Sequence, residues 1–194
     1  MSDLITYSQV RDCEKFDDFA LQNIVKLKSK VAYFEKPSYL SNLDFISIIL
    51  PEYVTFSKTK NQIELFLIES SLNFENYILD LSFGPFQMKL SFIEKVIANS
   101  PTYILIDKEL IKLKANGFKV DKKALKHLNT INTQWIILRA FEYLNRQVYF
   151  NSGINGLRCL YNSGFEYCKV IYFSKIDCDK KTYNEWANYL IELK

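Results

Sequence analysis

The stretch "TQWIILRAFEYLNRQV", residues 133 to 148, carries apolar side chains on every side of a helix. These side chains are Trp135, Ile137, Leu138, Phe141, Leu144 and Val148. A helix that is apolar all round is normally buried by the elements packed around it. The stretch therefore predicts a central helix in a mainly α-helical protein.

Further helices are expected on both sides of this one. Residues 14 to 33 show apolar residues at helical spacing, with lysines and aspartates between them. Ser91 and Glu94 follow the capping-box pattern that opens a helix. Residues 154 to 161 predict a separate short helix, because Gly164 soon follows and glycine commonly stands just after a helix end.

Length and composition indicate a soluble globular protein. The 194 residues suffice for one domain with a sizeable core, or for one domain with an extension, and 48% are hydrophobic. The net charge of +3 is low and the lysines are dispersed, so we expect no nucleic-acid partner. No stretch approaches the roughly 20 apolar residues that span a bilayer. The opening residues also lack the apolar core of a secretory signal.

The cysteines do not suggest a metal site. Cys13, Cys159, Cys168 and Cys178 form no CxxC pair, and His127 is the single histidine. A Cys/His metal site is therefore not expected, and no cofactor is predicted. We expect free, partly buried thiols. One disulfide among the three cysteines near the C-terminus is the alternative.

One acid follows directly on an apolar run, in "LFLIESSLNF" at residues 65 to 74. In the simplest interpretation Glu69 faces solvent at a helix end. In the functional interpretation its apolar neighbours surround the carboxyl. Burial of that kind raises the pKa of a carboxyl, so that it can donate a proton near neutral pH. Cleavage of a glycosidic bond requires such a donor, because the leaving oxygen must be protonated.

Two further fragments follow Glu69-Ser70 along the chain. The segment Gly84-Pro85-Phe86-Gln87 ends eighteen positions after Glu69, and Tyr161-Asn162-Ser163-Gly164 comes far downstream. In this order and with this interval, the three fragments resemble the goose-type lysozyme and soluble lytic transglycosylase superfamily. Its members carry Glu-Ser at a helix end, then a Gly-x-x-Gln turn, and later an Ala-Tyr-Asn-Ala-Gly segment.

The resemblance implies a lysozyme-like helical domain over residues 57 to 194. Residues 1 to 56 have no counterpart in it, and we expect them to form an N-terminal helical extension packed on the core. It implies a bacterial peptidoglycan lytic transglycosylase, which cleaves the β-1,4 bond between N-acetylmuramic acid and N-acetylglucosamine. Glu69 would serve as general acid and then as general base. The matched motifs imply a substrate-binding set of Ser70, Gly84, Gln87, Tyr161 and Asn162. For Ser70 and Tyr161 purely structural roles remain open.

The outcome of the reaction depends on a second carboxylate. Hydrolytic glycosidases use one to activate water, and the candidates here are Glu75 and Asp80. The soluble transglycosylases work with one acid, because the C6 hydroxyl of the muramic acid attacks and a 1,6-anhydro ring forms. Without a clear partner for Glu69 we expect this non-hydrolytic route. A hydrolytic goose-type lysozyme is the alternative.

Peptidoglycan lies outside the cytoplasm, whereas the sequence shows no export signal. We therefore expect synthesis in the cytoplasm and action in the periplasm or cell wall. A secretion or phage-like injection apparatus would deliver the protein, and its components would be partners besides the glycan strands. An alternative of another class is a catalytically inactive lysozyme-like module in a cell-envelope machine. The lysine-rich residues 106 to 126 support a third interpretation, a basic interaction domain.

Overall fold

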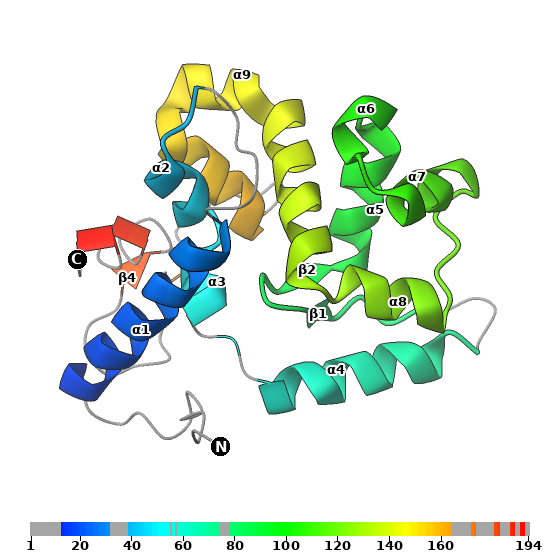
Figure 1. Ribbon diagram of the computed structural model, residues 1–194, viewed down its shortest axis with the longest axis horizontal. Coiled ribbons are helices and arrows are strands. Elements are labelled where there is room, and N and C mark those ends of the chain that lie inside the picture. The colour runs from blue at the N-terminus through cyan, green and yellow to red at the C-terminus, as the bar shows by residue number, and fades with distance from the viewer. Residues whose placement is uncertain are drawn as a thin grey trace. The chain divides into compact units, whose positions relative to one another are not determined.

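The computed structural model describes residues 13–31, 39–54, 56, 58–73, 78–163, 172–173, 181–182, 187–188 and 191–192. Within these residues the protein is mainly α-helical, with nine helices and minimal strand content, which confirms the predicted class (Figure 1). The helices are α1 (Cys13–Val31), α2 (Asn42–Ser47), α3 (Leu50–Val54), α4 (Lys58–Ser71), α5 (Leu90–Asn99), α6 (Thr102–Leu105), α7 (Lys108–Ala115), α8 (Lys122–Leu128) and α9 (Ile131–Ser163). Two antiparallel hairpins pair β1 (Ser82–Phe83) with β2 (Met88–Lys89) and β3 (Tyr172–Phe173) with β4 (Lys181–Thr182).

The chain divides into two compact units. One comprises Met1–Thr55 with Arg146–Lys194, and the other comprises Phe56–Asn145. From the sequence we instead expect one division, after residue 56, with residues 57 to 194 in one domain. The difference arises because the C-terminal part of α9 packs with the N-terminal helices. The Nε of Arg158 donates to Ser47 Oγ over 2.9 Å, and the rings of Tyr39 and Tyr149 lie 5.5 Å apart.

In the unit Phe56–Asn145, α5 and the first part of α9 both contribute side chains to the core. The buried side chains of α5 recur at helical spacing, and Phe92 meets Phe141 of α9 with a ring-centroid distance of 5.4 Å. In the predicted central helix Trp135, Ile137, Leu138 and Phe141 are buried, as expected, whereas Leu144 and Val148 are only half-buried. The apolar side chains of residues 133 to 148 are therefore buried only as far as Phe141.

Helix α9 is longer than the sequence predicts. The sequence predicts two helices, over 133 to 148 and 154 to 161, whereas the structure has a single helix over Ile131–Ser163. Gly153 lies between the two predicted helices with a φ of 64°, a left-handed conformation that glycine adopts at little cost. Between the two predicted helices, the helix thus continues with an altered backbone conformation at Gly153.

A buried arginine connects parts of the unit formed by Met1–Thr55 and Arg146–Lys194. Arg158 donates from Nη1 to Asn155 Oδ1 over 3.1 Å and to Asn188 Oδ1 over 2.7 Å. The neighbouring Cys159 is disulfide-bonded, which overturns the expectation of a free thiol at this position. Cys168 and Cys178 lie outside the described residues.

None of the helices in the described ranges is both long enough and apolar enough to cross a bilayer.

Candidate functional site

Helix α4 carries Glu69 and Ser70 in its last turn. Ile68 is buried, whereas the side chain of Glu69 is 32% exposed and its Oε1 lies 3.4 Å from Lys122 Nζ. Lys122 stands at the start of α8, which lies next to the end of α4 (Figure 1). The functional interpretation of Glu69 expects apolar surroundings for this carboxyl, but the structure supplies an ammonium group and partial solvent exposure, as the simplest interpretation expects in part. The Oγ of Ser70 donates to the carbonyl of Phe66 over 2.8 Å, so this hydroxyl is bound within its own helix.

The segment Gly84–Gln87 forms the turn of the β1–β2 hairpin. The N–H of Gln87 donates to the carbonyl of Gly84 over 3.0 Å, and Pro85 occupies the second turn position, which suits its fixed φ. The N–H of Gly84 donates to Asn61 Oδ1 over 2.6 Å, and Asn61 is a buried residue of α4. This hydrogen bond connects the turn to the helix that carries Glu69.

The side chain of Gln134 leaves no room for a Cβ at position 84. Its φ is 76°, and a Cβ at this position would lie 1.9 Å from Nε2 of Gln134 on α9. Gln134 is buried, accepts from the N–H of Phe86 over 2.8 Å and donates to the carbonyl of Phe83 over 3.0 Å. The space that the sequence analysis assigns to a substrate is therefore filled by the amide that holds the hairpin.

Gln87 lies at the other end of α4 from Glu69. Its Nε2 donates to the carbonyl of Gly84 over 3.0 Å, and its Oε1 accepts from Lys60 Nζ at 3.5 Å. Lys60 precedes Glu69 by nine residues, which corresponds to about 13 Å along a helix axis. The structure thus connects both motif residues to one helix without bringing their side chains into contact.

A second carboxyl on α4 carries no motif and is missed by the sequence analysis. Glu64 lies 3.4 Å from Lys60 Nζ through Oε1, and its side chain is only 13% exposed. Its Oε2 is buried and has no hydrogen-bond partner among the described residues. Buried carboxylate oxygens are normally paired, so this one calls for an explanation. The only sequence signal is the Lys60–Glu64 spacing, which on a helix usually indicates a surface ion pair.

Of the two candidates for a second carboxylate, the structure describes Asp80 but not Glu75. Asp80 accepts from the N–H of Ser91 over 2.9 Å and from its Oγ over 2.7 Å, so both carboxylate oxygens bind the first turn of α5. The predicted capping box of Ser91 and Glu94 is therefore wrong. Helix α5 begins at Leu90 after Lys89, whose side chain makes no capping bond, and Asp80 supplies the acceptor instead. Glu75 lies outside the described residues.

Tyr161 and Asn162 lie in the last turn of α9, in the unit that contains Arg146–Lys194. Burial raises the pKa of the Tyr161 phenol well above its usual range, and the carboxylate of Glu52 adds to the effect. The structure therefore places Glu69, Ser70, Gly84 and Gln87 in one compact unit and Tyr161 with Asn162 in the other.

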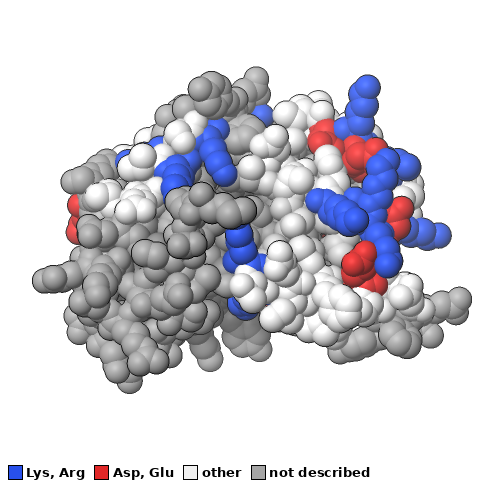
Figure 2. All heavy atoms as spheres, turned by 60° about the horizontal axis from the view of Figure 1, so that its bottom comes forward, with Lys and Arg blue, Asp and Glu red and all other residues white. Residues whose placement is uncertain are grey.

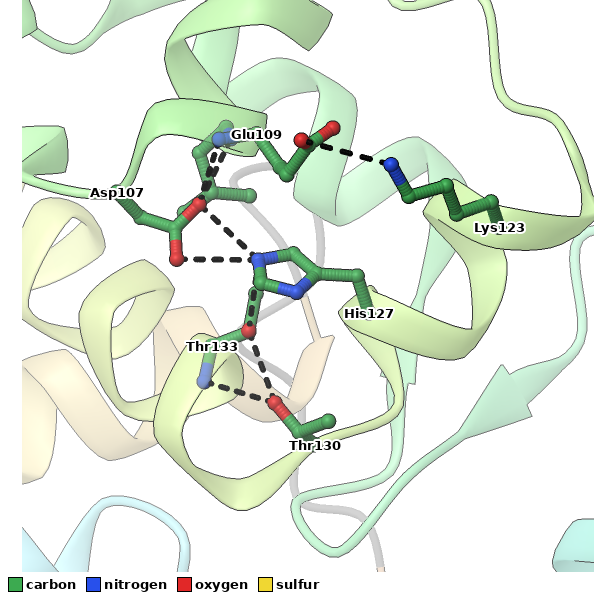
Figure 3. Close-up of polar contacts among 7 residues, drawn as sticks. Asp107, Glu109, Lys123, His127, Thr130 and Thr133 are labelled. Atoms are coloured by element: carbon green, nitrogen blue, oxygen red, sulfur yellow. Dashed lines mark hydrogen bonds and ion pairs between the residues drawn. The ribbon is translucent and has the colours of Figure 1, made fainter.

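A histidine and an aspartate also meet in the unit Phe56–Asn145 (Figure 3). The Nε2 of His127 lies 3.0 Å from both carboxylate oxygens of Asp107 and 3.3 Å from Thr133 Oγ1. A catalytic relay uses the two ring nitrogens separately, one for the acid and one for the nucleophile, whereas here one nitrogen meets both. Asp107 also accepts from the N–H groups of Glu109 and Leu110 at the start of α7. The network therefore links α7, α8 and α9.

The site residues found in one unit are thus two acids on one helix, Glu69 and Glu64, and a hairpin turn that presents Gln87. Among the residues that the structure describes, no group of three or more His, Cys, Asp or Glu could hold a metal ion. Comparison of the chain with protein-family models, with curated proteins and with solved structures finds no match.

Proposed function

We propose that the protein is a peptidoglycan lytic transglycosylase with a lysozyme-like helical domain, in which Glu69 is the general acid and base. The observation that carries the proposal is the attachment of the Gly84–Gln87 turn to α4. Asn61 of this helix accepts from Gly84, and the same helix presents Glu69 in its last turn, partly exposed. A helix-borne acid followed by a glycine-glutamine turn is the arrangement that the motif resemblance implies.

In the proposed reaction Glu69 gives its proton to the oxygen that leaves the anomeric carbon. The resulting carboxylate then accepts the proton of the C6 hydroxyl as that oxygen attacks the same carbon, which closes the 1,6-anhydro ring. The ion pair with Lys122 must open first, and the lysine side chain is 64% exposed and can swing away. Gln87 offers amide donors and an acceptor for a hydroxyl or N-acetyl group.

The bonding of Asp80 favours the non-hydrolytic route. Both of its oxygens bind Ser91, so moving it to activate a water would leave the start of α5 uncapped. The disulfide at Cys159 supports action outside the cytoplasm, because disulfides persist in oxidising compartments such as the periplasm. Delivery by a secretion or injection apparatus remains part of this proposal.

A second candidate function is a non-catalytic glycan-binding or structural module of a cell-envelope machine. Two observations favour it. The Glu69 carboxylate is already paired with Lys122, and Gln87 is bonded at the opposite end of α4. In such a module the same surface would hold a glycan strand without cleaving it.

The test is digestion of purified sacculi followed by mass spectrometry of the released fragments. We expect anhydro-muropeptides from the wild-type protein and a loss of at least about 100-fold in Glu69→Gln, because general acid catalysis contributes 10²–10⁴. Glu109→Gln is the matched control, since this acid also pairs with a lysine of α8, Lys123, at 3.9 Å. This variant should retain activity.

The other outcomes are equally informative. Reducing ends in place of anhydro ends would mean hydrolysis. Loss of cleavage in Glu64→Gln with retention in Glu69→Gln would transfer the acid role to Glu64. No release by a protein that is folded by circular dichroism and still binds sacculi would favour the non-catalytic module.

A further inference from the structure

Helix α4 exposes apolar side chains on its outer face, opposite its buried residues. Asn61, Ile68 and Ser71 are buried, whereas Ile63 and Phe66 are 56% and 66% exposed and Leu67 is exposed as well. Residues three and four positions apart share one side of a helix, so Ile63, Phe66 and Leu67 form a continuous stripe. Apolar residues exposed singly are normal on a protein surface, whereas a contiguous exposed apolar patch indicates an interaction site.

Lysines border this stripe at both ends of the helix. Lys58 and Lys60 lie in the first turn of α4, and at the other end Glu69 pairs with Lys122 of α8. Helix α8 also exposes Lys123 and Lys126. Figure 2 brings the α4 side forward and shows basic side chains gathered at the right, where α7 and α8 lie, with a few acidic ones among them.

The net positive charge of the chain is concentrated in the α7–α8 segment. Residues 107 to 127 contain seven lysines against three carboxylates, a net charge of +4, whereas the whole chain carries +3. The remaining residues therefore sum to −1. The lysines are Lys108, Lys112, Lys114, Lys119, Lys122, Lys123 and Lys126.

We propose that the docking surface formed by Ile63, Phe66 and Leu67 of α4 and Lys122, Lys123 and Lys126 of α8 binds an anionic lipid bilayer. Interfacial helices insert an apolar stripe to the headgroup boundary while flanking lysines contact the anionic headgroups. Lys122 of α8 pairs with Glu69, which follows Phe66 by three residues on α4, so the lysines of α8 begin beside the C-terminal end of the stripe.

Charge complementarity favours an anionic bilayer over a second copy of the chain as the partner of this docking surface. A second copy of the chain offers no surplus of negative charge to match the lysines, because the rest of the molecule sums to −1. An anionic polymer would match the lysines but would leave the apolar stripe without a partner. This proposal uses none of the chemistry of Glu69 and does not depend on the proposed function.

The experiment is co-sedimentation of the full chain with vesicles of phosphatidylcholine alone or mixed equally with phosphatidylglycerol. We expect binding only to the anionic vesicles, and weaker binding as salt increases. Phe66→Ser should weaken binding about tenfold, since it removes most of a phenyl group's apolar transfer energy. Lys126→Gln should weaken it about fivefold, from roughly 1 kcal/mol per lysine near an anionic surface.

The matched control is Phe150→Ser, which removes a phenylalanine that is 62% exposed in the other compact unit. This variant should bind like the wild type. A gain-of-signal variant, Phe66→Trp, should shift its fluorescence to the blue on anionic vesicles. Equal binding to both kinds of vesicle, no binding, or full binding by Phe66→Ser would overturn the proposal. So would a dimer in solution that Phe66→Ser dissociates, because a second copy would then cover the surface.

Discussion

Two carboxyls on α4 lie five residues apart in different surroundings. Glu69 carries the motif, is part-exposed and pairs with Lys122, whereas Glu64 carries no motif and keeps one oxygen buried without a hydrogen-bond partner among the described residues. Leaving a buried polar atom unpaired costs free energy, and such costs are tolerated most often at functional sites. The motif therefore favours Glu69 and the burial favours Glu64, which is why the digestion experiment includes both substitutions.

The residue whose role the structure changes most is Gly84, and its role can be tested directly. Gly84→Ala should lower the free energy of unfolding by about 3 kcal/mol, because the new Cβ would collide with Gln134 and the φ of 76° is unfavourable for alanine. Urea denaturation measures the effect. Gly117→Ala is the matched control. Its φ is 69° but no atom lies within 4 Å of the new Cβ, so only the backbone strain of about 1 kcal/mol remains. Equal losses in the two variants would contradict a packing role for Gly84.

Among the elements, those with strong local signals could be predicted from the sequence. The apolar residues of 133 to 148 predict a buried helix, and α9 buries Trp135 and Phe141. The Glu-Ser pair and the glycine-glutamine segment suggest a helix end and a turn, and the structure has α4 and a hairpin turn there. The division into two units could not be predicted, since it depends on the contact of Arg158 with Ser47, more than a hundred residues away. The contacts that place Glu64 and Gln87 around Lys60 are likewise not visible in any motif.

Helix α5 shows how a distant residue replaces a local cap. Ser91 and Glu94 have the capping-box spacing, yet the acceptor for Ser91 comes from Asp80, eleven residues earlier. Asp80 thereby connects the loop before β1 to the helix after β2. This use of the carboxylate is structural and needs no substrate.

The role of Asp80 at the start of α5 gives a prediction at the scale of the element. Asp80→Ala should lower the free energy of unfolding by about 1–2 kcal/mol, the usual cost of removing a helix cap. Asp80→Asn keeps an oxygen that can accept from the Ser91 N–H and should cost less. Both are measured by urea denaturation, together with the fragments released from sacculi. The ratio of anhydro to reducing ends should stay unchanged, and a loss of reducing ends in either variant would restore Asp80 as the residue that activates water.

At the scale of the whole molecule, the third motif fragment belongs to a different unit from the first two. Tyr161 lies in the last turn of α9, where burial and the Glu52 carboxylate of α3 both keep its phenol neutral. This environment joins the C-terminal part of α9 to the N-terminal helices, as the Arg158 hydrogen bonds do. Tyr161 therefore contributes to the stability of the unit Met1–Thr55 with Arg146–Lys194, whatever role it has in binding a glycan.

This environment predicts a loss of stability in alkaline solution. In the unfolded chain the Tyr161 phenol ionises above pH about 10, whereas in the folded protein burial and Glu52 raise its pKa. Its contribution to stability is therefore fully present below pH 10. As the pH rises from there toward the folded-state pKa, the free energy of unfolding should fall by about 1.4 kcal/mol per pH unit from this group.

Tyr161→Phe isolates this contribution, because phenylalanine cannot ionise. Urea denaturation of the wild type and the variant between pH 8 and pH 11 should give a smaller alkaline loss for the variant, even though other tyrosines and the lysines also titrate in this range. Tyr103→Phe, at a residue that is 68% exposed in the unit Phe56–Asn145, is the control and should keep the wild-type pH dependence. If Tyr161→Phe and the wild type lose stability in parallel, the phenol is not held neutral by the fold. The packing of the end of α9 against Glu52 would then have to be different.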